Sequence, residues 1–246
     1  TNAARFLGRV EGKTGRMIES RGGKNGAPGV SVDEFFYRKF PYLHPIHPAL
    51  PVIGQRPSVT VFVPSLTPRG FFGGIATLLI VSASLAKKLG YDYRVVQTSG
   101  FDKRTSVLDF LAKNGIVIDS DKFSTLDISK RNIYHYAYLP LHPDDVIVVS
   151  AWWDAYNASK LPLAKKFVYM LQDYEPIFYN NGDEQQLAES TYHTKSFIPL
   201  CNTELIYKYF SSNGYKYIQD NALRFEPAVA LSPQKQKKHN KKTLFL

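Results

Sequence analysis

Two carboxylates, Asp173 and Glu175, open the segment 172–192, whose sequence is QDYEPIFYNNGDEQQLAESTY. They directly follow an apolar run over residues 166–172 that predicts a strand. In an open parallel sheet, ligands bind beyond the carboxyl ends of the strands. Carboxylates placed there accept hydrogen bonds from the hydroxyl groups of a sugar or take a proton from one, so both are candidate catalytic residues. The alternative is that Glu175 and Pro176 only form a turn.

Aromatic residues accompany these carboxylates. Flat apolar faces on which a sugar ring could pack are offered by Tyr174, Phe178, Tyr179 and Tyr192, unless they simply cover the sheet edge. Trp152, Trp153 and Asp154 close a second strand predicted over residues 146–151. Because neighbouring strand residues point to opposite faces, we expect one tryptophan in the core and Trp153 in the cleft. Asp154 is expected to cap the following helix.

Three glycines, Gly70, Gly73 and Gly74, precede a helix predicted over residues 75–89. A glycine-rich turn into a helix exposes backbone N–H groups that could hold a phosphate. The spacing does not match the dinucleotide-binding pattern, and no acidic residue closes the next strand, which ends at Gln97 and Thr98. Both observations argue against NAD. The alternative is a turn that requires glycine for its shape alone.

The histidines and the single cysteine do not form a recognisable metal motif. The six histidines lack the H-E-x-x-H pattern, and Cys201 has no second cysteine with which to hold zinc or form a disulfide. No metal site is therefore expected. A serine hydrolase of the G-x-S-x-G type is also excluded.

These candidate residues require a scaffold of alternating strands and helices. Strands are predicted over residues 59–64, 93–98, 116–118, 146–151, 166–172 and 196–200, with a last one near Tyr217; helices are predicted over residues 75–89, 103–114, 154–164 and 203–211. Asn202 is the candidate cap of the last helix. Such alternation is typical of an α/β fold with a Rossmann-like open parallel sheet and helices on both faces.

The net charge of +10 comes mostly from the two ends of the chain. Residues 1–26 carry six basic and two acidic groups, and five lysines lie between residues 235 and 242. We therefore divide the chain into a basic, proline- and aromatic-rich arm (1–57), a near-neutral domain (58–231), and a linker that leads into the first strand of a further domain (232–246). The longest apolar run, residues 75–85, is shorter than the roughly 20 residues that cross a bilayer.

Three stretches carry a resemblance to a known family: PSLTPRGFFGGIATLLIVSASLAKKLGY, VVSAWWDAY and YMLQDYEPIFYNNGDEQQLAESTY. Together they resemble the N-terminal domain of retaining GT-B glycosyltransferases, and specifically bacterial rhamnosyltransferases that build surface glycans. The resemblance covers about residues 59–231. It implies the N-terminal half of a two-domain enzyme whose missing second domain holds most of the donor. The chain alone is therefore expected to be inactive.

The resemblance also implies roles for the candidate residues. Gly73 and Gly74 would lie near the donor diphosphate, and Asp173, Tyr174 and Glu175 would lie beside the reacting sugars. The donor would be a nucleotide sugar such as dTDP-L-rhamnose, no metal would be required, and the acceptor would be a glycan or a lipid-linked oligosaccharide. The enzyme would be cytoplasmic, and the basic tails would allow peripheral contact with the inner face of the membrane.

Two other classes of function are compatible with the sequence. A non-catalytic glycan-binding module would bind oligosaccharides but no nucleotide sugar. Binding to anionic lipid or nucleic acid through the basic tails would depend steeply on salt and would be lost with residues 1–26 and 234–242. We expect no specific nucleic-acid partner, because the domain between the tails is close to neutral.

Overall fold

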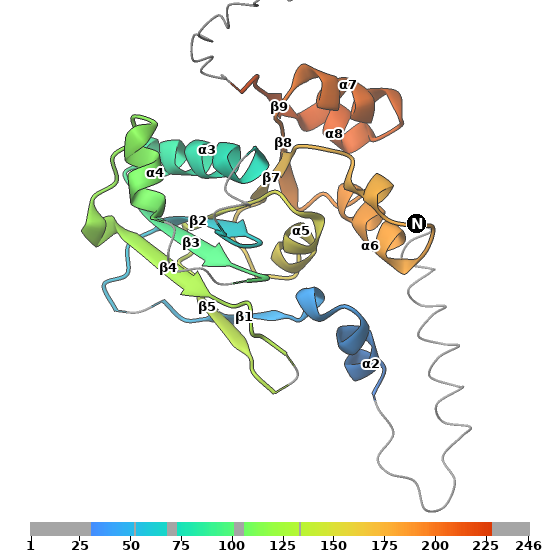
Figure 1. The fold of residues 1–246 in the computed structure, drawn as a ribbon, viewed down its shortest axis with the longest axis horizontal. Helices are drawn as coiled ribbons and strands as arrows, with labels where there is room; N and C mark the ends of the chain where they lie inside the picture. The colour runs from blue at the N-terminus through green and yellow to red at the C-terminus, as the bar shows by residue number, and fades with distance from the viewer. Residues whose placement is uncertain (1–30, 52, 68–72, 101–105, 133, 228–246) are drawn as a thin grey trace, which may run out of the picture.

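A computed structural model describes residues 31–51, 53–67, 73–100, 106–132 and 134–227 (Figure 1). The helices are α2 (Val32–Lys39), α3 (Gly74–Leu89), α4 (Val107–Lys113), α5 (Trp152–Ala158), α6 (Asp183–Tyr192), α7 (Glu204–Ser212) and α8 (Lys216–Asn221). The strands are β1 (Ile46–Ala49), β2 (Ser58–Val63), β3 (Asp92–Gln97), β4 (Phe123–Asp127), β5 (Ala137–Pro140), β6 (Val146–Val149), β7 (Phe167–Leu171), β8 (Phe197–Cys201) and β9 (Leu223–Arg224). Short 3-10 turns cover Pro41–Leu43 (η1), Ser120–Lys122 (η2) and Glu175–Phe178 (η3).

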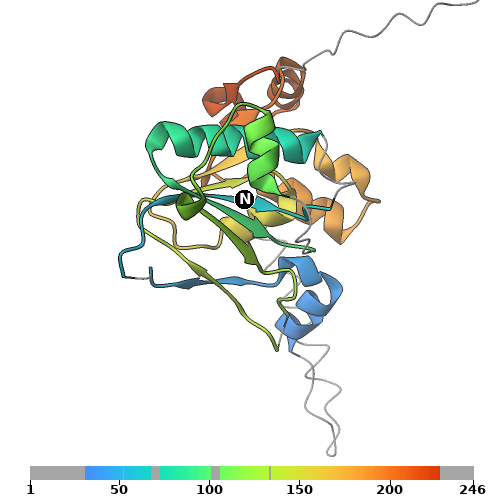
Figure 2. The same cartoon turned by 60° about the vertical axis from the view of Figure 1, so that its left-hand side comes forward.

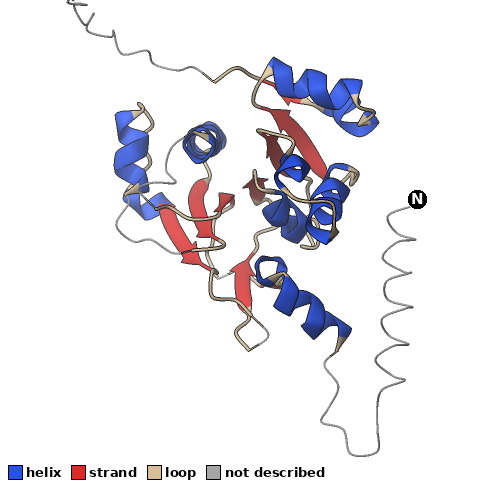
Figure 3. Cartoon of the chain, turned by 45° about the vertical axis from the view of Figure 1, so that its right-hand side comes forward, coloured by secondary structure: helices blue, strands red, loops and turns tan. Residues whose placement is uncertain are grey.

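Seven of these strands form one parallel sheet in the order β4-β3-β2-β6-β7-β8-β9. Helices lie on both sides of it (Figure 3), which confirms the predicted Rossmann-like α/β fold. The remaining two strands, β1 and β5, pair in parallel as a separate ribbon, with Ile46 opposite Ala137. The sheet order reverses direction between β2 and β6, and open α/β sheets usually bind their ligands at the carboxyl ends of the strands on either side of such a reversal.

The alternation of side chains along β2 explains how two cores form. Val59, Val61 and Val63 pack with the apolar face of α3 and with α4 in one cluster. Phe62 points to the other face, where α5 and the β1–β5 ribbon contribute to a second cluster. Both faces of β2 are therefore buried, as a central parallel strand requires. Figure 2 shows α3 and the ribbon on opposite sides of the sheet.

The N-terminal segment, defined here as residues 31–51, packs onto the domain. Phe40 and Leu43 join Trp152 of α5 and two residues of α6 in a third buried cluster. Lys39 pairs with Asp183, and the Tyr42 hydroxyl donates to Glu184, so both acidic residues at the start of α6 hold this segment. The part of the arm that the structure describes is thus continuous with the domain, while residues 1–30 lie outside the described part.

Several sequence-based predictions of elements were wrong. Residues 116–118 are not a strand; the third strand on that side is β4, five residues later. The segment near Tyr217 forms α8 rather than a strand, and a two-residue strand, β9, follows it. Helix α7 is capped by Thr203, whose hydroxyl accepts from the backbone N–H of Ile206 at 3.1 Å, and not by Asn202.

Candidate active site

The loops that follow β2, β6 and β7 meet at the carboxyl edge of the sheet. Gly73 and Gly74 begin α3 after β2, Ser150 follows β6, and Gln172 follows β7. The side-chain amide of Gln172 donates to the Ser150 hydroxyl at 2.5 Å and to the backbone oxygen of Gly74 at 3.2 Å. One amide therefore ties all three loops together at the point where the sheet reverses.

This contact explains why glycine occupies position 74. A Cβ atom at Gly74 would overlap the Gln172 amide, whose carbon would lie only 3.0 Å away. Gly73 precedes it with φ of 62° and ψ of −116°, a backbone conformation that residues with a side chain rarely adopt. The backbone geometry and packing therefore explain why glycine occupies both positions, without requiring a bound phosphate. Gly70, the third glycine of the predicted loop, lies outside the described residues.

Glu175 is largely buried and binds the start of α5. Its carboxyl group accepts the backbone N–H of Trp152 at 3.1 Å, and its own backbone N–H donates to the Tyr192 hydroxyl at 3.2 Å. Burial raises the pKa of Glu175 to about 8, against the lowering effect of the Trp152 N–H, while the charges of Asp154 and Asp173 raise it further. Glu175 is therefore largely protonated at neutral pH.

Asp173, in contrast, is exposed at the same edge. One of its carboxylate oxygens accepts the backbone N–H of Tyr174 at 2.8 Å, which fixes the direction of the side chain. The two candidate carboxylates thus differ in environment: Asp173 faces solvent, and Glu175 is turned inward to the start of α5. Only Asp173 is placed to meet a ligand directly.

The candidate aromatic residues also divide by exposure. Phe178 is 64% exposed and Tyr192 only 1% exposed. Tyr174 packs against Tyr192 in a cluster of rings, and its hydroxyl donates to Glu189 at 2.6 Å. Tyr179 is half-buried, and its hydroxyl accepts from the indole N–H of Trp152 at 2.8 Å. In this structure Tyr192 packs in the interior, Tyr174 is partly buried against it, and Phe178 presents an open ring.

The two tryptophans begin α5 rather than ending a strand. Trp152 is completely buried, as expected for one of the pair. Trp153 is half-buried and packs beside Tyr42 of the N-terminal segment, with ring centroids 5.9 Å apart. Asp154 does not cap the helix. The N-cap residue of α5 is Ala151, and the backbone N–H of Trp152, the first residue of the helix, donates to the Glu175 carboxyl group.

Asp154 instead belongs to a buried polar group that the sequence did not reveal. It is fully buried, and burial raises its pKa to about 7 against the lowering influence of the nearby Thr98 hydroxyl and Arg131 guanidinium. Arg131 lies in the loop after β4 and is 6% exposed. No motif marks it, because its partners are backbone atoms. Its guanidinium donates to the carbonyls of Tyr42, His44, Thr98 and Ile128 at 2.5 to 3.0 Å.

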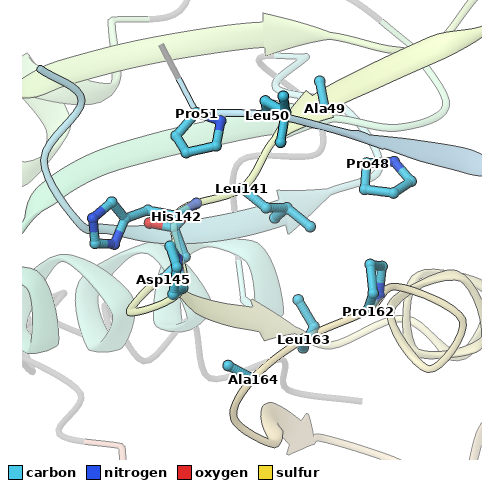
Figure 4. A pocket seen from close by; sticks show the side chains of 11 residues that line it. Pro48, Ala49, Leu50, Pro51, Leu141, His142, Asp145, Pro162, Leu163 and Ala164 are labelled. Carbon is cyan, nitrogen blue, oxygen red and sulfur yellow. The ribbon is translucent and has the colours of Figure 1, made fainter. Parts of the chain in front are cut away.

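A surface pocket of about 460 Å³ lies at the opposite, amino edge of the sheet (Figure 4). It is lined mostly by prolines and aliphatic residues, including Pro48, Leu50 and Leu163. The one carboxylate on its wall, Asp145, accepts from the backbone N–H groups of Ser58 and His142 at 2.6 and 2.9 Å. Asp145 thus holds the backbone at Ser58 and His142 in place. The candidate residues Asp173 and Glu175 lie at the opposite edge of the sheet.

Within the described ranges, no group of three or more histidine, cysteine, aspartate or glutamate residues is arranged to hold a metal ion. No helix among those residues is long and apolar enough to cross a membrane. The basic stretches 1–26 and 235–242 lie outside the described part, so the structure does not bear on membrane or nucleic-acid binding through them.

Comparison with known proteins identifies the family to which the chain belongs. The chain is 37% identical over 65 residues to the O-antigen biosynthesis protein RfbC of Myxococcus xanthus, a match that spans 26% of this chain and 5% of that protein. The family model described as "WsaF, N-terminal domain" matches residues 58–204. This match begins at the first residue of β2 and includes the loops after β2, β6 and β7 and the segment from Asp173 to Tyr192. The chain belongs to the family of WsaF N-terminal domains, a family of the glycosyltransferase type.

Proposed function

We propose that this chain is the acceptor-side domain of a retaining GT-B glycosyltransferase. The enzyme transfers L-rhamnose from a nucleotide diphosphate donor, such as dTDP-L-rhamnose, to a surface polysaccharide. The proposal is supported by the family match over residues 58–204 and by the O-antigen relative. Another domain of the complete enzyme would bind most of the donor. We further propose that no metal ion takes part and that the enzyme works at the cytoplasmic face of the membrane.

The observation that carries this proposal is the contact that Gln172 makes between the loops after β2, β6 and β7. The segment that begins at Asp173 is tied through Gln172 to the start of α3, so an acceptor held at Asp173 would lie beside the backbone of Gly73 and Gly74. A helix start offers N–H groups to an anion such as a diphosphate. Donor and acceptor would therefore meet where the sheet order reverses, which is where open α/β sheets bind ligands.

Different roles follow for the two carboxylates. Asp173 orients the acceptor hydroxyl by accepting its hydrogen bond, because it is exposed and its direction is fixed by the Tyr174 N–H. Glu175 acts as a positioning residue: its bond to the Trp152 N–H fixes the loop that carries Asp173. Phe178 offers its exposed ring to the acceptor sugar. We propose that Tyr179, which follows Phe178 directly, adds to this surface, and that Trp153 also contacts the acceptor.

The test uses the protein in its complete natural reading frame. Asp173→Ala is expected to lower kcat about 100-fold or more with little change in KM, because the bond to the hydroxyl matters most in the transition state. The matched control is Asp220→Asn, which removes an exposed carboxylate that pairs only with Lys216 on α8. A near-normal kcat for Asp173→Ala would refute its role. If the complete protein binds oligosaccharide but neither binds nor consumes a nucleotide sugar, a non-catalytic glycan-binding module is the correct reading.

A further inference from the structure

Three exposed tyrosines form a row along β5 and the residues before it. Tyr134, Tyr136 and Tyr138 are 77%, 58% and 58% exposed. They alternate with Ala137 and Leu139, which are buried in the core on the other side of the β1–β5 ribbon. Because successive strand residues point to opposite faces, Tyr136 and Tyr138 share the outward face. We call Tyr134, Tyr136 and Tyr138 the tyrosine row.

The neighbouring strand orders these rings. His47 of β1 is in register with Tyr138. Its imidazole lies 5.0 Å from the Tyr136 ring and 5.8 Å from the Tyr138 ring, measured between ring centroids. The two tyrosines are therefore held against a common neighbour while more than half of each side chain stays open to solvent. Little conformational freedom would be lost on binding a ligand, which favours a binding surface.

A polar pocket adjoins the start of the row. It has a volume of about 470 Å³ and is lined by Ser129, Lys130, Arg131, Asn132 and His135. The side-chain oxygen of Asn132 accepts the backbone N–H groups of Tyr134 and His135 at 2.8 and 3.1 Å, which builds the turn that joins the pocket to the row. The pocket follows β4, so it lies at the same carboxyl edge of the sheet as Asp173.

The charges of this surface select the kind of ligand. Residues 128–142 include no aspartate or glutamate, and their only lysine or arginine residues are Lys130 and Arg131. Arg131 is buried and directs its guanidinium at four backbone carbonyls. A polyanion such as a nucleic acid or an anionic membrane needs several cations in contact. One solvent-facing cation beside open aromatic rings instead suits a neutral polyhydroxylated chain.

We propose that the tyrosine row and the pocket beside it bind a neutral glycan chain, at a subsite separate from the place of sugar transfer. Sugar C–H faces pack on the open tyrosine rings, while Ser129, Asn132 and His135 exchange hydrogen bonds with hydroxyl groups. From Tyr136 to Tyr138 the row spans about 7 Å at the usual rise of a strand, and Tyr134 continues it at the turn beside Asn132, so the row is long enough to contact more than one sugar unit. This inference rests on the proposed function, because the chain it binds is the distal part of the acceptor.

The binding experiment uses the 246-residue chain and a neutral L-rhamnose oligosaccharide, with free L-rhamnose, heparin and vesicles of anionic phosphatidylglycerol as comparison probes. Calorimetry should detect oligosaccharide binding that depends on the tyrosine row, whereas any binding of heparin or of the vesicles should come from the basic stretches 1–26 and 235–242 and be lost when these are removed. The double variant Tyr136→Ala/Tyr138→Ala should weaken oligosaccharide binding about tenfold. The corresponding double phenylalanine variant should retain most of the affinity, since it keeps the rings.

The matched control is Phe35→Ala, which removes an aromatic ring of similar exposure, 59%, from α2. It should bind the oligosaccharide like the parent chain, and the thermal midpoints of all variants should agree because the changed rings are exposed. Equal affinity of the double alanine variant and the parent would overturn the proposal. So would an equal loss in Phe35→Ala, or heparin or vesicle binding that the double alanine variant weakens as much as it weakens oligosaccharide binding.

Kinetics of the complete enzyme separate this inference from the proposed function. The double alanine variant should raise KM for a long acceptor and leave kcat and transfer to a short acceptor unchanged. Transfer that is insensitive to the double variant would refute the subsite alone. Absence of any transfer, together with oligosaccharide binding that depends on the tyrosine row, would refute the transferase and leave the subsite standing.

Discussion

Replacing Glu175 with glutamine should change how the stability of this domain depends on pH. The carboxyl group has a folded-state pKa of about 8 against an ordinary value of 4.5, chiefly because it is buried. Between these two pH values the folded protein keeps a proton that the unfolded chain has released. The free energy of unfolding therefore falls as pH rises through this window, and the loss is complete above about pH 8, where both states are ionised.

The size of the effect follows from the width of the window. Each pH unit between the two pKa values is worth about 1.4 kcal/mol. Because pH 7 lies two to three units above the pKa of the unfolded chain, ionisation of Glu175 lowers the free energy of unfolding at that pH by about 3 kcal/mol. Glutamine carries no charge at any pH and still offers an oxygen to the Trp152 N–H. The free energy of unfolding of Glu175→Gln should therefore equal that of the parent near pH 5 and exceed it by about 2 to 3 kcal/mol at pH 7.

Urea unfolding followed by tryptophan fluorescence between pH 5 and 9 measures this difference, and Trp152 lies directly at the changed group. Asp154 adds to the same trend, because burial raises its pKa from 3.8 to about 7; the double variant Glu175→Gln/Asp154→Asn should remove most of the fall. Asp144→Asn serves as the control, since Lys165 lowers the pKa of that exposed carboxyl. Parallel pH curves for the parent and Glu175→Gln would refute the assignment of a buried, protonated Glu175.

Three further outcomes are expected. Gly74→Ala should lower the free energy of unfolding in urea by about 1 to 3 kcal/mol, because the added Cβ would displace the Gln172 amide. Gly182→Ala is the control: its backbone is extended and its added Cβ would have no atom closer than 3.9 Å, so stability should not change. Equal effects of the two substitutions would contradict the crowding argument. Arg131→Met should remove the guanidinium from four carbonyls, of which Tyr42 and Ile128 keep another donor, at about 3 kcal/mol. Limited proteolysis should then cut the N-terminal segment first, and an unchanged digestion pattern would show that other contacts hold it. Cys201 should resist alkylation in the folded protein and react on unfolding, because burial raises its thiol pKa to about 12; fast labelling of the native chain would contradict its burial.

The sequence predicted the elements whose patterns are local and strong. The β-branched run of β2 and the glycine that ends α3 gave these elements correctly to within a residue or two. Gly90 has φ of 70°, a left-handed conformation that ends a helix at little cost only for glycine. By contrast, β4 has the sequence FSTLD and is half exposed, so its apolar pattern is weak. It is a strand because β3 offers it an open edge, which no local pattern indicates.

The candidate site shows the same division. The sequence located Asp173, Glu175 and the glycines at one edge of a parallel sheet, because the order of strands and loops along the chain determines which loops share an edge. It did not distinguish an exposed Asp173 from a buried Glu175 two residues later, since burial depends on α5 and α6, which pack from elsewhere in the chain. The roles of Arg131 and Asp154 could not be predicted from the sequence for a related reason. Arg131 donates to backbone carbonyls that come together only when the N-terminal segment packs on the sheet, and Asp154 is buried only by that packing. Chain order thus determined where the polar residues gather, and only tertiary packing decided which of them keep contact with water and which lose it.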